Sequence, residues 1–177
     1  MANVKRRGKN IKKKLYKAVM LKRKGARYRE MYLETRELSN KIAKRTAEKV
    51  DEHFKKIMFD TENEIKEHVP SKHVMEAFKY VESVLYKNGI AYTFNIQEDS
   101  MQPLKIDNTD FNDVDIHAVC NKIVNKAVKE IENVLSTADN VIHSMSEKHC
   151  PMKKTGVVIM KRKLEEELLD CGLECEF

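Results

Sequence analysis

The residues in this sequence best suited to chemistry are the cations at its N-terminal end. Residues 1–29 contain 13 Lys and Arg and no Asp or Glu, and the first carboxylate is Glu30. The other 148 residues carry 21 Lys and Arg against 28 Asp and Glu, so a chain of net charge +6 divides into a strongly basic arm and an acidic body. A block of like charge repels itself and typically contacts a polyanion, most often a phosphate backbone. We refer to residues 1–29 as the basic arm.

Lysine outnumbers arginine in the arm, and lysine contacts phosphate as a point charge rather than as a planar fork. Tyr16 and Tyr28 lie among the cations, and their rings are of a type that stacks on bases or sugars. We predict non-specific binding to the phosphate backbone of nucleic acid. The alternatives are an acidic protein surface, including the chain's own linker, or an arm that stays solvated. The residues expected to make the contact are Lys5, Arg6, Arg7, Lys9, Lys12, Lys13, Lys14, Lys22, Arg23 and Lys24.

The cysteines and histidines lack the spacing of a metal site. There is no Cys-x-x-Cys, and the best set pairs His117 with Cys120 and His149 with Cys150. Zinc needs four ligands that converge as a tetrahedron, whereas these two pairs fall at opposite ends of one long predicted helix. We therefore expect reduced thiols without metal. A disulfide between Cys171 and Cys175 is a weaker alternative.

The remaining titratable clusters are predicted to be structural. The acids of residues 107–115 lack the spacing of a calcium loop and are expected to form a solvated linker that supplies helix-capping side chains. These acids are Asp107, Asp110, Asp113 and Asp115. His68 and His149 each stand two residues before a proline, which is typical of a helix C-terminus and favours capping over a catalytic pair.

The sequence gives no support to an enzyme. It contains no phosphate-binding loop, dinucleotide-binding glycine motif, nucleophile elbow or zinc-protease motif. We predict no catalytic residue, no cofactor and no metal. No stretch is apolar enough to span a membrane, and the basic N-terminal end is not followed by the apolar stretch of a secretory signal. We expect the protein in a virus particle or in the cytoplasm.

The elements that carry the arm are predicted to be mainly α-helical, with a small β element. Apolar residues recur at helical spacing over residues 10–24, where Gly25 would end a helix, and again to His68. Thr61 and Glu64 resemble a capping box, which predicts a break near Phe59. The later elements are expected at 71–87 (helix), 90–96 (strand), 112–146 (helix), 155–160 (the start of a helix or a strand), 163–170 (helix) and 173–177 (strand).

The elements after the arm also suggest an internal repeat. When His68 is aligned with His149, Pro70 falls on Pro151, and a small shift after the prolines brings Gly89 onto Gly172. We predict two related helix–helix–strand units about a pseudo-two-fold axis, residues 30–97 and 112–177, joined by an acidic linker, residues 98–111. Chance similarity between amphipathic helices is the alternative.

Together these features predict a non-enzymatic assembly subunit. Residue usage rich in Lys, Ile, Asn and Met is typical of small virus or phage proteins. We therefore expect a virion component that contacts neighbouring protein subunits and forms an oligomer. The alternative is a regulatory module that binds nucleic acid through its arm and a protein partner through its body.

Overall fold

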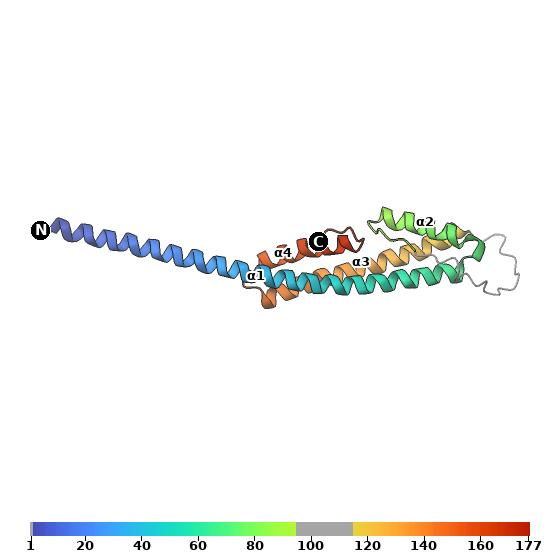
Figure 1. The fold of residues 1–177 in the computed structure, drawn as a ribbon, viewed down its shortest axis with the longest axis horizontal. Helices are drawn as coiled ribbons and strands as arrows, with labels where there is room; N and C mark the ends of the chain where they lie inside the picture. The colour runs from blue at the N-terminus through green and yellow to red at the C-terminus, as the bar shows by residue number, and fades with distance from the viewer. Residues whose placement is uncertain (1, 95–114) are drawn as a thin grey trace.

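The computed structural model describes the backbone of residues 2–94 and 115–177, and the side chains of residues 15–94 and 115–177. Its elements are α1 (Ala2–His68), the 3-10 turn η1 (Ser71–His73), α2 (Val74–Lys87), α3 (Ile116–His149) and α4 (Lys153–Asp170). Helices α1 and α3 run antiparallel, and α4 and α2 follow one another along one side of this pair (Figure 1). The prediction of a mainly helical protein is confirmed.

Helix α1 is continuous, so both predicted interruptions are wrong. It passes through Gly25, where a glycine in a helix interior costs only about 1 kcal/mol. It also passes Phe59, because Thr61 does not cap a new helix. The Thr61 hydroxyl is buried and donates to the carbonyl of Ile57, one turn earlier in the same helix (2.7 Å).

The helix ends follow the sequence more closely. Helix α1 ends at His68, two residues before a proline, as predicted, and α3 continues to His149, three residues beyond its predicted end and again two residues before a proline. Asp115 caps the start of α3, since its carboxylate accepts from the backbone N–H of Ala118 (3.1 Å). The other three predicted capping acids, Asp107, Asp110 and Asp113, lie outside the described residues.

The two predicted strands meet but do not form a sheet. Within the described residues they share a single antiparallel bridge, Ile90 with Leu173. The N–H of Ala91 donates to Gly172 O (2.7 Å), and the N–H of Glu174 donates to Gly89 O (2.8 Å).

The register explains why this pairing stops. With Ile90 opposite Leu173, residues beyond Ala91 would face the end of α4, and residues beyond Glu174 would face the end of α2, and both ends are helical. Further along, side-chain carboxylates bond the backbone instead: the N–H of Phe94 donates to Glu82 (2.8 Å), and the N–H of Phe177 donates to Glu165 (2.9 Å). Residues 95 and 96 of the first predicted strand lie outside the described residues.

The α3–α4 corner resolves the ambiguous segment at 155–160 as helix. Helix α4 begins at Lys153, so the strand alternative is wrong, and the helix predicted at 163–170 is its second half. Gly156 lets the first turn of α4 approach α3, because a Cβ there would lie 2.6 Å from Ser146 Oγ. The Cys171 and Cys175 thiols are free, so the suggested disulfide is absent.

The core lies between the α1–α3 pair and the two shorter helices that pack along it. Phe54 of α1 contacts Tyr92 edge-on (ring centroids 5.8 Å apart), and Phe78 of α2 lies against Phe94 (4.8 Å). The largest fully buried side chains are Phe78, Met58, Ile65, Leu85, Ile142, Met160, Leu164, Leu168 and Leu173.

Candidate functional site

The N-terminal half of α1 extends beyond the other helices as a single helix (Figure 1). We call residues 2–34 the projecting helix; at about 1.5 Å per residue they span roughly 50 Å. Between residues 15 and 34 no side chain is buried and only Met31 is partly covered. The first buried residue is Thr35, which has no exposed surface. The predicted binding arm therefore lies almost wholly within a part of α1 that no described residue covers.

A cluster of small polar side chains fixes the point where α1 leaves the body. Thr35 Oγ1 accepts from the backbone N–H of Met152 (3.2 Å), in the α3–α4 corner. Ser39 Oγ donates to Gly156 O (3.3 Å) and lies 3.7 Å from Cys150 Sγ. These contacts attach α1 to the α3–α4 corner. The projecting helix continues directly from this attached part of α1.

The structure places all ten predicted contact residues in this one helix. Lys22, Arg23 and Lys24 have exposed side chains. For the other seven the structure describes only the backbone, which is helical. These seven are Lys5, Arg6, Arg7, Lys9, Lys12, Lys13 and Lys14. Tyr16 and Tyr28 are also exposed.

The spacing of the cations suits a phosphate backbone. Thirteen cations over the 28 helical residues 2–29 amount to about one per 3.2 Å of helix axis. Phosphates follow one another at about 3.4 Å along each strand of duplex DNA. Among the described side chains, the cations between Lys17 and Arg29 form no ion pair.

Exposed apolar side chains accompany these cations. Leu15 and Val19, on the stripe predicted for residues 10–24, are both exposed. Leu21 and Leu33 are exposed as well, and helical periodicity alone did not single them out. The described part of this helix thus presents aliphatic and cationic groups together.

The thiols are poor candidates for nucleophilic chemistry. Burial raises the pKa of the Cys175 thiol to about 11 and also raises the pKa of Cys120 and Cys171. A raised pKa keeps a thiol protonated, and therefore weakly nucleophilic, at neutral pH.

The candidate metal ligands do not converge. His117 and His149 lie at opposite ends of α3, about 48 Å apart at 1.5 Å per residue. The His117 ring contacts Tyr80 (centroids 4.7 Å apart). Within residues 15–94 and 115–177, no three His, Cys, Asp or Glu side chains are grouped so that they could hold a metal ion.

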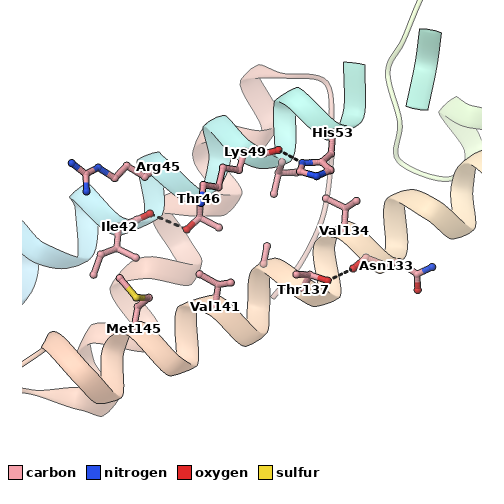
Figure 2. A pocket seen from close by; sticks show the side chains of 12 residues that line it. Ile42, Arg45, Thr46, Lys49, His53, Asn133, Val134, Thr137, Val141 and Met145 are labelled. Atoms are coloured by element: carbon pink, nitrogen blue, oxygen red, sulfur yellow. Dashed lines mark hydrogen bonds between the residues drawn. The ribbon is translucent and has the colours of Figure 1, made fainter. Parts of the chain in front are cut away.

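One surface feature, a groove between two helices, is not indicated by any pattern in the sequence. A groove of about 670 Å³ lies between α1 and α3, lined by residues 42–53 of α1 and residues 133–145 of α3 (Figure 2). Its position depends on which faces of the two helices remain uncovered by α2 and α4, and periodicity along one helix does not reveal this.

Comparison of the chain with protein-family models, curated proteins and solved structures finds no match. In the described part of the chain, no helix combines the length and the apolar character needed to cross a membrane.

Proposed function

We propose that the protein is a non-enzymatic structural subunit of a nucleic-acid-containing assembly, such as a virus or phage particle. Its projecting helix contacts phosphate backbones without reading their sequence, and its body contacts neighbouring subunits. One observation carries the proposal: the helix that holds the 13 cations leaves the body at Thr35, and no side chain described before that residue is buried.

The shape of the projecting helix favours nucleic acid over a folded acidic protein. It is a rod of roughly 50 Å, and its cations are spread between Lys5 and Arg29 rather than gathered in one patch. That cationic part spans about 36 Å, which matches about 11 steps of a 3.4 Å duplex rise. Lysine-rich helices of this kind gain affinity mainly through counterion release, which is independent of sequence.

We also propose that the body arose from two related units, and hydrogen bonds paired at equivalent positions support this. Leu85 O accepts from the N–H groups of Asn88 and Ile90, and Leu168 O accepts from those of Cys171 and Leu173. Both units then have a glycine at positive φ, +74° at Gly89 and +84° at Gly172.

The test is a salt titration of nucleic-acid binding with the full chain. Fluorescence anisotropy with labelled duplex DNA and RNA of unrelated sequences should give equal affinities, and log Kd should rise linearly with log salt. The triple substitution K22Q/R23Q/K24Q should reduce that slope by up to about 2.7, at roughly 0.9 per phosphate contact.

The matched control removes three exposed lysines from the body, with K72Q/K79Q/K87Q. This variant has the same net charge as the first and should keep the slope of the native protein. If both variants lowered the salt slope equally, net charge alone would explain the change in binding. That result would refute the proposed role of the projecting helix.

A further inference from the structure

The groove between α1 and α3 has an apolar floor and a cationic edge. Ile42 and Val50 of α1 and Val134 and Val141 of α3 contribute to the floor. Arg45, Lys49 and His53 line the α1 side, whereas the polar residues on the α3 side, Asn133 and Thr137, are uncharged (Figure 2). Among the described residues, no Asp or Glu lines the groove.

At the corresponding place in the other half of the α1–α3 pair, a cation and a carboxylate lie across from each other. There Lys126 of α3 and Glu64 of α1 form an ion pair across the two helices. In the alignment that places His68 on His149, Lys126 corresponds to Arg45 and Glu64 corresponds to Met145. Figure 2 shows Arg45 and Met145 at the same end of the groove, on opposite helices. The half of the pair that contains the groove therefore has a cation at the equivalent position, but it has an apolar side chain where the other half has a carboxylate.

At two neighbouring positions, too, an acidic residue in the other half corresponds to an apolar or basic residue in the groove. Asp60 of α1 corresponds to Val141 in the groove, and Glu130 of α3 corresponds to Lys49. Among the described residues Arg45 and Lys49 take part in no ion pair. An occupant of the groove would thus meet an apolar floor and side-chain cations that lack a carboxylate partner.

The dimensions of the groove fit one helix. Its lining runs from Ile42 to His53 on α1 and from Asn133 to Met145 on α3. At the rise of an α-helix each side is about 17–18 Å long, which is close to three helical turns. An amphipathic helix laid in such a groove presents residues i, i+3, i+4 and i+7 to the floor and its flanking residues to the rim. Acidic flanking residues would meet Arg45 and Lys49.

Charge argues against the other simple occupants. Two copies joined groove to groove would bring cations against cations, and the projecting helix of another copy is itself basic. Nucleic acid would satisfy the cations but would leave the apolar floor against phosphates, which is unfavourable.

We propose that the α1–α3 groove is a docking site for an acidic amphipathic helix of a partner protein. The site is separate from the projecting helix and does not depend on polyanion binding there. Binding should bury the floor and neutralise Arg45 and Lys49.

The test uses the full chain and a fluorescein-labelled 16-residue peptide with Leu at its third, sixth, seventh, tenth, 13th and 14th positions and Glu on the flanks. A scrambled peptide of equal composition reports generic attraction to the basic arm. At salt near 150 mM the amphipathic peptide should bind at least tenfold more tightly than the scrambled one. Equal affinity of the two peptides for the native chain would overturn the proposal.

Two substitutions assign the binding to the groove. Met145→Glu places a carboxylate opposite Arg45, as Glu64 stands opposite Lys126, and should weaken binding at least tenfold. The control Val158→Glu makes the same charge change at a side chain of α4 that is 67% exposed, and should stay within twofold of the native chain. Equal effects in the two variants would refute the assignment.

Charge reversal gives a readout that does not depend on Met145. Arg45→Glu should weaken the Glu peptide and strengthen a version with Lys on its flanks, while circular dichroism stays unchanged because Arg45 is exposed. If Met145→Glu instead abolishes self-association in light scattering, a second copy occupies the groove. If Met145→Glu weakens duplex DNA binding more than Val158→Glu does, nucleic acid occupies the groove. Either result would contradict the proposal.

Discussion

The two halves of α1 have the same backbone structure but are stabilised differently. Residues 35–68 bury a stripe that includes Val50, Phe54 and Ile65 against the other helices. Residues 15–34 bury nothing and carry exposed leucines beside cations. Tertiary contacts hold residues 35–68 in the helix. Residues 15–34 are held only by helix propensity and by continuation from the body.

This difference separates stability from binding. An isolated charged helix is marginal in water because nucleation is costly, so the body supplies the first turns from which the projecting helix continues. Repulsion between its cations opposes this order, and neutralisation by a polyanion would relieve the repulsion. We infer that the body sets the unfolding free energy, while the projecting helix responds to its ligand.

The largest expected contrast comes from the same change made in the two regions. Leu168→Ala removes a fully buried side chain of α4 and should lower the unfolding free energy by about 2–5 kcal/mol. Leu21→Ala removes a side chain of the projecting helix that is 62% exposed and should change it by less than about 0.5 kcal/mol. Urea denaturation followed by circular dichroism measures both. A loss above about 1 kcal/mol for Leu21→Ala would show that residues 15–34 pack against something in solution.

A second contrast substitutes two glycines by alanine. Gly172 has φ of +84°, and a Cβ there would collide with the carbonyl oxygen of Ala91 across the bridge, so Gly172→Ala should cost about 2–3 kcal/mol. Gly25 lies within α1 with nothing near its Cβ position, so Gly25→Ala should strengthen the local helix by about 0.5–1 kcal/mol.

Different measurements suit these two glycine variants. Urea denaturation reports Gly172→Ala, because the bridge belongs to the body. Amide hydrogen exchange between residues 15 and 34 reports Gly25→Ala, since the projecting helix opens locally without the body unfolding. Faster exchange there after Gly25→Ala would mean that the helix is interrupted at this point.

The sequence predicted the features that depend on local periodicity. The helical stripes containing Val50 and Leu85 were predicted because burial recurs every three to four residues, and both residues are buried. The two prolines marked the ends of α1 and α3 because a residue before proline avoids the helical conformation. The basic arm was evident from charge alone; that it binds a polyanion stays a prediction.

The features that depend on distant partners were not predictable. The predicted strand at 90–96 pairs through one bridge alone within the described residues, because the antiparallel register sets the residues after the bridge against the ends of α2 and α4. Thr61 resembled a cap, yet the surrounding burial favours an internal hydrogen bond to Ile57. The α1–α3 groove depends on two helices that are far apart in the chain, so neither stripe by itself indicates it.

The smallest contrast lies at the boundary between the two regions. Thr35→Val keeps the side-chain volume but removes the oxygen that accepts from the N–H of Met152, and it should cost about 1–2 kcal/mol because that N–H loses its partner. Leu33→Ala, two residues earlier on the exposed side of the boundary, should change the unfolding free energy by less than about 0.5 kcal/mol.

Urea denaturation measures both boundary variants, and amide exchange at Met152 should accelerate only in Thr35→Val. The projecting helix should keep its own exchange rates, because Thr35 ties α1 to the α3–α4 corner and not to any part of residues 15–34. If exchange in residues 15–34 accelerates together with Met152, the two regions form one cooperative unit. The division of α1 into a stabilising half and a binding half would then be wrong.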